Sequence, residues 1–75
     1  MYTMYETTTL NIDGCIIKDV EEYALKDNIK YIIGIYDSRY DFYWFWGAFS
    51  AGREDAADET VRVCSSRRKK FVINK

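Results

Sequence analysis

The chain contains no histidine and only two cysteines, Cys15 and Cys64. A tetrahedral zinc site needs four nitrogen or sulfur ligands, so we expect no metal site and no other cofactor. Histidine catalysis is excluded, and Cys64 falls near the end of a predicted helix, where the dipole disfavours a thiolate. We therefore expect a protein that is not an enzyme, with both thiols reduced.

The sequence also lacks proline, and no Gly- or Ser-rich linker or internal repeat divides it. We expect residues 1–75 to form a single small domain. No window approaches the roughly 18 apolar residues of a membrane-spanning helix, and the first residues have no signal-peptide pattern. These absences predict a cytoplasmic protein with no membrane contact.

Positive charge is scarce in most of the chain. Residues 1–66 carry six basic and twelve acidic side chains, a net charge of −6, whereas the last nine residues carry five basic side chains and no acid. The sequence thus indicates an acidic body with a basic end.

Large apolar side chains are concentrated between Asn28 and Ser50. The segments Ile29–Tyr36 and Phe42–Phe49 are rich in β-branched and aromatic residues, which predicts two strands joined by a loop of three to five residues. Alternation in the second strand places side chains on two faces, neither of them polar: Phe42, Trp44, Trp46 and Ala48 on one, and Tyr43, Phe45, Gly47 and Phe49 on the other. Such a strand is central in a sheet, or its second face is a contact surface.

The segment before this hairpin gives conflicting signals. Residues 2–12 alternate from Thr8 onward, which predicts a strand. The Asp13-Gly14 pair that follows is typical of a tight hairpin turn. A helical stripe nevertheless runs through the next residues, and it favours a helix over 15–26 with Asp13 as its N-cap and Asn28 near its exit. The stripe consists of Ile16, Ile17, Val20, Tyr23 and Ala24.

The segment after the hairpin predicts a second helix, beginning at Ser50 or Gly52 and ending near Ser66, because acids lie early and arginines late. Phe71–Ile73 then predicts a short final strand. The order β-α-β-β-α-β indicates an α+β two-layer sandwich on the ferredoxin-like plan, with a four-stranded antiparallel sheet and two helices on one face. The Thr-rich first strand leaves a different strand order open.

Two motifs resemble sites but favour structural interpretations. Gly47 and Gly52 have the spacing of a phosphate-binding loop, yet Arg53 and Glu54 stand where that loop requires Lys and Ser or Thr. Asp37 and Asp41 flank the hairpin loop, where acids normally form turns.

The remaining signal is an excess of aromatic residues, with two Trp, seven Tyr and four Phe in a chain of 75 residues. We expect the sheet to expose some of them to a partner, from one face or the other, because Trp and Tyr contribute strongly to protein interfaces. The candidate partner-binding residues are Tyr5, Tyr43, Trp44, Phe45, Trp46 and Phe49.

The resulting hypothesis is a small protein-binding module whose acidic surface favours a basic partner. Such a partner could be a nucleic-acid-handling protein, and the short chain is compatible with a phage-type modulator or inhibitor of a host protein. One alternative is single-stranded nucleic-acid (RNA) binding through the sheet aromatics and the basic run Arg67, Arg68, Lys69 and Lys70. The other is a self-associating structural protein, such as a homodimer.

Overall fold

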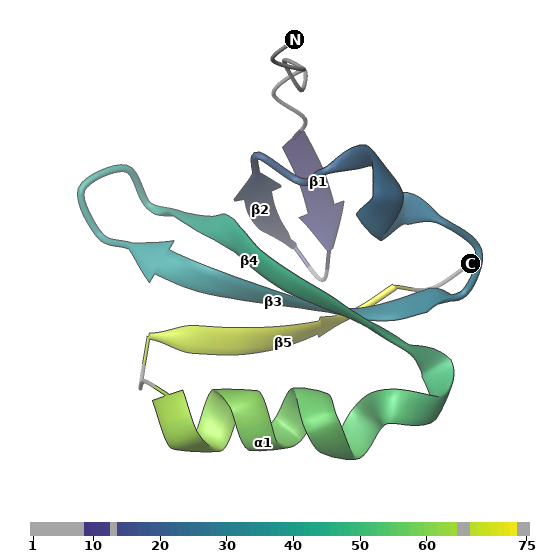
Figure 1. The fold of residues 1–75 in the computed structure, drawn as a ribbon. Coiled ribbons are helices and arrows are strands. Elements are labelled where there is room, and N and C mark those ends of the chain that lie inside the picture. Colours follow the sequence, from purple (N-terminus) through teal and green to yellow (C-terminus); the bar gives the residue numbers. More distant parts are fainter. Residues whose placement is uncertain (1–8, 13, 65–66, 74–75) are drawn as a thin grey trace, which may run out of the picture.

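The computed structural model describes residues 9–12, 14–64 and 67–73. In this part of the chain, five strands form one mixed sheet that is accompanied by one α-helix and two short 3-10 turns (Figure 1). The elements are β1 (Thr9–Ile12), β2 (Cys15–Lys18), η1 (Glu22–Leu25), β3 (Ile29–Asp37), β4 (Phe42–Ser50), η2 (Ala51–Arg53), α1 (Glu54–Cys64) and β5 (Arg68–Val72).

The strand order is β1-β2-β4-β3-β5, and the β2–β4 pair is parallel whereas the other neighbours are antiparallel. The predicted ferredoxin-like fold, with four antiparallel strands and two helices on one face, is therefore wrong. The α+β character is correct, but a second β-hairpin replaces the first predicted helix. The predicted first strand is observed only as β1, since residues 1–8 lie outside the described part of the chain.

The helix predicted over 15–26 is wrong because the tight turn overrides the helical stripe. Ile12 pairs with Cys15, so two residues connect β1 to β2, and Gly14 adopts a φ of 79° that costs a glycine little. The predicted helix cap at Asp13 lies outside the described residues.

The stripe nevertheless marked several residues that are buried. Ile17, Val20 and Ala24 are buried in the core, although they come from a strand, an irregular segment and a 3-10 turn. Ile16 points the other way and is 44% exposed, as expected for a strand in which successive side chains face opposite sides. In this segment the apolar pattern therefore predicted several buried residues correctly but not the secondary structure that buries them.

The predicted central hairpin is confirmed as β3 and β4, with four loop residues between them. The backbone carbonyl of Asp37 accepts hydrogen bonds from the amides of Tyr40 and Asp41, at 3.2 and 2.9 Å. Asp41 supplies the positive φ, 58°, that the glycine-free loop requires. The Asp41 carboxylate accepts a 2.9 Å hydrogen bond from the Tyr36 hydroxyl, which raises the pKa of Tyr36.

A register shift in β4 changes which aromatic residues share a face. Ile33 pairs with Gly47, but Gly34 pairs with Phe45, so Trp46 is an extra residue in the ladder. The predicted two-residue alternation therefore fails beyond this point. Side chains of Tyr43 and Phe45 pack on the same cluster as Ala48, whereas Phe49 packs on the opposite one.

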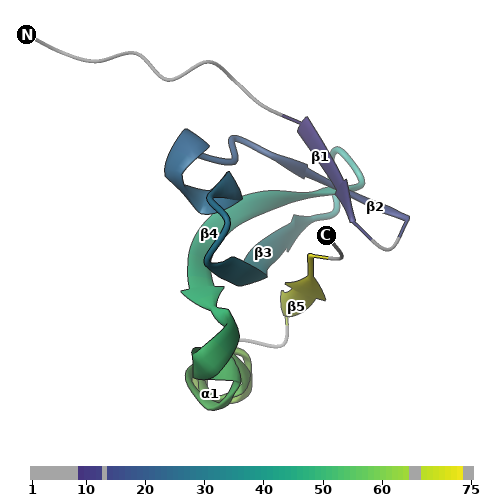
Figure 2. The same cartoon turned by 90° about the vertical axis from the view of Figure 1, so that its right-hand side faces the viewer.

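The sheet separates two apolar clusters. In Figure 2 the strands follow an arc from β5 through β3 and β4 to the β1–β2 hairpin. The concave side encloses the larger cluster, which contains Ile12, Ile17, Val20, Ala24, Ile32 and Phe71. On the other side α1, the second predicted helix, packs Ala57 and Val61 against Tyr31, Ile33, Phe49 and Val72.

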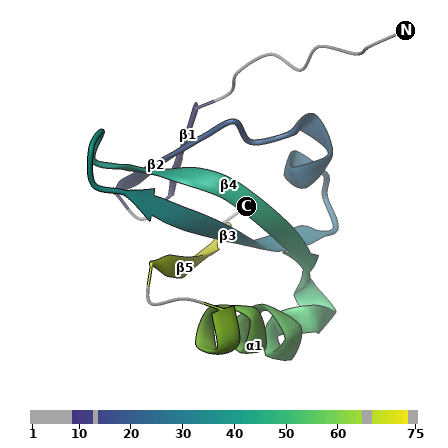
Figure 3. The ribbon, with the colours of Figure 1, turned by 60° about the vertical axis from the view of Figure 1, so that its left-hand side comes forward.

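The final strand was predicted at Phe71–Ile73 and is observed as β5, which begins earlier and pairs with β3. The β3–β4 loop projects from the sheet beyond the point where α1 ends and β5 begins (Figure 3). The sheet face that carries α1 is therefore covered only in part.

Candidate functional site

One row of side chains crosses the uncovered part of the α1 face. Lys18 pairs with Trp44, Trp44 with Ile35, and Ile35 with Arg68, so these four residues lie side by side on four strands. Arg68 is on the same face of β5 as Val72, which packs on α1. A basic residue therefore stands at each end of the row, with Trp44 and Ile35 between them.

Three aromatic residues are exposed here: Tyr40, Trp44 and Trp46 have 60%, 36% and 43% of their surface accessible. We refer to these three residues as the aromatic surface. The Arg68 guanidinium lies over the Trp46 ring, 4.7 Å from its centroid. Trp46 is thus accessible beside Arg68, on the part of the sheet that α1 leaves open.

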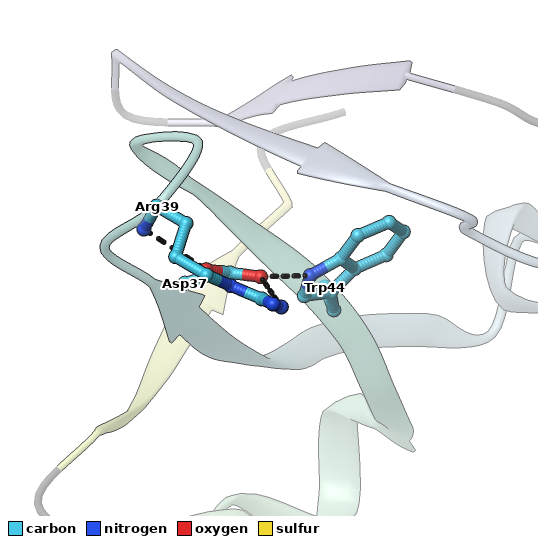
Figure 4. Close-up of polar contacts among 3 residues, drawn as sticks. All are labelled: Asp37, Arg39 and Trp44. Carbon is cyan, nitrogen blue, oxygen red and sulfur yellow. Dashed lines mark hydrogen bonds and ion pairs between the residues drawn. The ribbon is translucent and has the colours of Figure 1, made fainter.

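Asp37 anchors the exposed indole of Trp44 (Figure 4). Oδ2 of Asp37 accepts hydrogen bonds from Nε1 of Trp44 at 3.0 Å and from a terminal nitrogen of Arg39 at 2.9 Å. Oδ1 accepts from the Arg39 amide and from its Nε, at 3.0 and 3.1 Å. The Arg39 guanidinium and the Trp44 indole hold the pKa of Asp37 well below its usual range, since both stabilise the carboxylate.

The rings next to this network stack on one another. The centroid of the Phe42 ring lies 5.6 Å from that of Tyr40, in a stacked arrangement, and 4.7 Å from that of Trp44, edge to face. The Lys18 ammonium is 4.8 Å from the Phe42 centroid, on the exposed side of β2. Phe42 is buried as a result, and it supports the two exposed rings.

Two open hollows flank Trp44. The larger has a volume of about 480 Å³ and is lined by Lys18, Asp19, Tyr40, Phe42 and Trp44. The second has a volume of about 370 Å³ and lies toward β3 and the loop, where Ile35, Asp37, Arg39 and Arg67 contribute to its walls. Trp44 is therefore a ridge with a recess on each side, which suits contact with another molecule.

The predicted basic run does not form one patch. Lys70 pairs with Glu54 at 2.9 Å and with Asp58 at 2.7 Å, so α1 neutralises it. Lys69 points to the opposite face, where its ammonium is 5.2 Å from the Phe71 centroid and 3.9 Å from Sγ of Cys15, a free and half-buried thiol. Arg68 contributes to the aromatic surface through its contact with the Trp46 ring.

The predicted partner-binding residues are distributed over several environments. Tyr5 lies outside the described residues. Tyr43 and Phe45 are half-buried against the larger cluster, and Phe49 is half-buried beside α1. Trp44 and Trp46 are the exposed members of the set. The sequence did not decide which face of the strand is exposed, and the structure shows that it is the face with the two tryptophans.

Tyr40, Lys18 and Arg39 were not predicted for this surface. The spacing of Tyr40, Phe42 and Trp44 at every second residue was a signal for the stacked rings. Lys18 could not be found in this way, because its place beside Trp44 depends on the β2–β4 pairing that the predicted helix excluded.

Comparison of the chain with protein-family models, with curated proteins and with solved structures finds no match. Among residues 9–12, 14–64 and 67–73, no group of three Asp, Glu, Cys or His side chains could hold a metal ion. No helix in the same ranges is long and apolar enough to cross a membrane.

Proposed function

We propose that the chain is a non-enzymatic protein-binding module that engages its partner through the aromatic surface. The observation that carries the proposal is the exposure of two tryptophans, Trp44 and Trp46, on one strand of a sheet face that α1 leaves uncovered. Large exposed apolar side chains of this kind mark contact sites, and Trp, Tyr and Arg are the residue types that dominate interface energies.

The exposed rings are held in place before any partner binds. Asp37 fixes the polar edge of Trp44, and Arg68 stacks on Trp46. Binding then costs little side-chain entropy, since these rotamers are already restricted. A module of this size could act as a modulator or inhibitor of a larger protein, because its contact surface is a rigid ridge rather than a catalytic cleft.

The test compares capture of cellular proteins by three immobilised forms of the chain. The variant Trp44→Ser/Trp46→Ser removes both exposed tryptophans. Val63→Ser is the matched control, because Val63 is an apolar residue of α1 that is 62% exposed. We expect a protein that is retained by the wild type and by the control but lost with the double variant. Far-UV circular dichroism and urea midpoints would verify that all three forms are folded.

Two results would contradict this proposal. One is equal retention of every captured protein by the double variant. The other is a stable dimer in light scattering that dissociates in the double variant, since the aromatic surface would then bind a second copy of the chain.

Single-stranded nucleic acid is the second candidate, favoured by the Arg68–Trp46 stack. Aromatic rings beside cations are a platform on which unpaired bases stack. Two other residues of the basic run weaken this candidate, because Lys70 is paired with acids and Lys69 faces the opposite side. Titration with oligouridine at low salt tests it, and strong binding that is lost in Trp46→Ser would favour RNA over protein.

A further inference from the structure

The border of the aromatic surface carries several cations, together with the carboxylates of Asp19 and Asp37. Each of three rings has a cation over it: Lys18 over Phe42 at 4.8 Å, Arg39 over Tyr40 at 5.3 Å, and Arg68 over Trp46 at 4.7 Å. The acids of α1 lie elsewhere, and two of them pair with Lys70. This distribution differs from the expectation of an acidic contact surface for a basic partner.

Two of these three cations lack a carboxylate. Arg39 is paired with Asp37 at 2.9 Å. Among the residues that the structure describes, none forms an ion pair with Lys18 or with Arg68. Arg68 and Lys18 are thus the positions at which an incoming anion would be stabilised.

The spacing of these two residues defines what could reach both. They stand at the ends of the row Lys18, Trp44, Ile35, Arg68, which spans four strands. Three strand spacings amount to about 14 Å, and an extended chain covers that distance in about four residues. In such a chain residues i, i+2 and i+4 point to the same side.

We propose that the aromatic surface binds an extended acidic segment of a partner protein, with carboxylates at positions i and i+4 and an apolar side chain at i+2. One carboxylate lies at Lys18 and the other at Arg68, and the apolar side chain packs on Trp44. This inference rests on the proposed protein-binding function and specifies the chemistry of the partner. Charge complementarity carries the specificity, and the rings carry the affinity.

A polyanionic nucleic acid fits the same residues less well. Its affinity comes from neutralising many phosphates, whereas this row has two cations without a carboxylate in the described part of the chain and the whole chain has a net charge of −1. A segment with two carboxylates matches the number of available cations.

The experiment titrates the chain with a blocked synthetic peptide that has Glu, Leu and Glu at alternate positions, separated by Thr. Matched peptides carry Gln or Lys in place of Glu. The readout is the pair of indole Nε1–H signals in two-dimensional NMR, which reports on Trp44 and Trp46 separately. We expect the Glu peptide to bind about tenfold more tightly than the Gln peptide, since two charge-assisted contacts are lost.

Protein variants locate the contact. Arg68→Met keeps the length of the side chain and removes the charge, and Lys69→Met is the matched control because Lys69 is the next residue of β5 and faces the other way. Arg68→Met removes one of the two charge-assisted contacts, so it should weaken the Glu peptide about threefold and leave the Gln peptide unchanged, which is a double-mutant cycle across the interface. Lys69→Met should change neither.

Several outcomes would overturn the inference. Equal binding of the Glu and Gln peptides would show that the cations play no role. Equal losses of affinity for the Glu peptide in Arg68→Met and Lys69→Met would show that only the net charge of the chain matters. Tighter binding of the Lys peptide would indicate a basic partner, and tighter binding of oligouridine would indicate nucleic acid. If no peptide binds but the tryptophan-dependent capture succeeds, the acidic segment is wrong while the protein-binding function stands; if that capture fails, the function itself is wrong.

Discussion

Nε1 of Trp44 donates a 3.0 Å hydrogen bond to Oδ2 of Asp37, and a terminal nitrogen of Arg39 donates to the same oxygen at 2.9 Å. An exposed tryptophan and a loop arginine thus share one carboxylate at the end of β3. The orientation of the ridge between the two hollows therefore depends on the charge of Asp37.

The first prediction concerns pH. Because the folded state lowers the pKa of Asp37, its contribution to stability is complete above its ordinary value of 3.8 and is lost as the pH falls through the lower folded value. We expect the Trp44 indole Nε1–H signal in NMR to stay constant from neutral pH to about pH 4 and to shift only below it. The Trp46 indole signal is the internal reference, since no contact with Asp37 is observed for that ring.

Asp37→Asn is the matched variant for this experiment. It keeps an oxygen acceptor for Trp44 but removes the charge that holds Arg39, so the acid-induced shift of the Trp44 signal should disappear. A Trp44 signal that titrates in the variant as it does in the wild type would show that another group controls the indole.

The second prediction separates the observed strand β2 from the helix that the sequence favoured. Ile17 is buried in the larger cluster, so Ile17→Ala should lower the free energy of unfolding by about 2–4 kcal/mol. Ile16 is 44% exposed, and Ile16→Ala should cost less than about 1 kcal/mol. Urea denaturation measures both. Similar losses for the two neighbours would contradict the strand, because a strand places them on opposite faces.

The third prediction concerns Gly34 of β3, where the side chains of Tyr43 and Phe71 leave no room for a Cβ. A Cβ on Gly34 would lie 2.8 Å from Cβ of Tyr43 and 3.2 Å from Cε2 of Phe71. Gly34→Ala should therefore destabilise the chain by about 1–3 kcal/mol, since neither strand can move apart without losing its ladder. Gly47→Ala is the control, because its Cβ would meet nothing within 4 Å. Thermal unfolding should show an unchanged midpoint for that variant, and equal losses for both would argue against the β3–β4 register.

The fourth prediction concerns the attachment of α1 to β5. Hydrogen bonds to Asp58 and Glu54 raise the pKa of Lys70 above its ordinary value of 10.5. The stabilisation is therefore complete below that value and is lost as the pH rises through the higher folded value. Lys70→Met should lower the melting temperature slightly more than Lys69→Met, and the difference should shrink in high salt. A difference that persists at high salt would assign the effect to packing instead.

Local sequence signals were sufficient for the central hairpin and for α1. Ile29–Asp37 and Phe42–Ser50 are strands because their β-branched and aromatic side chains fit a pleated surface on both sides. Acids early and Arg62 late favour α1 through its dipole. These features depend on neighbouring residues, so they could be predicted without knowledge of the tertiary structure.

The same local reasoning failed at Cys15–Lys18, where two valid signals competed. The Asp-Gly pair lies just before this segment, and the helical stripe runs through it. Only the pairing of the segment with β1 on one side and β4 on the other decides between the two signals. The place of Lys18 at one end of the row followed from this decision, because the β2–β4 pairing puts it beside Trp44.

By itself, the sequence determined the strand-rich middle of the chain, the second helix and the excess of aromatic rings over what a small core can enclose. Only the tertiary structure decided which rings are exposed. Alternation separates Tyr43 and Phe45 from Trp44 and Trp46, but only the packing of β4 in the sheet decides that the tryptophan face is the accessible one. The bulge at Trp46 then places Ala48 on the face of Tyr43 and Phe45, and Phe49 on the opposite face. The physical reason is that a strand's facing depends on its register with a partner, and register is a long-range property that no local pattern contains.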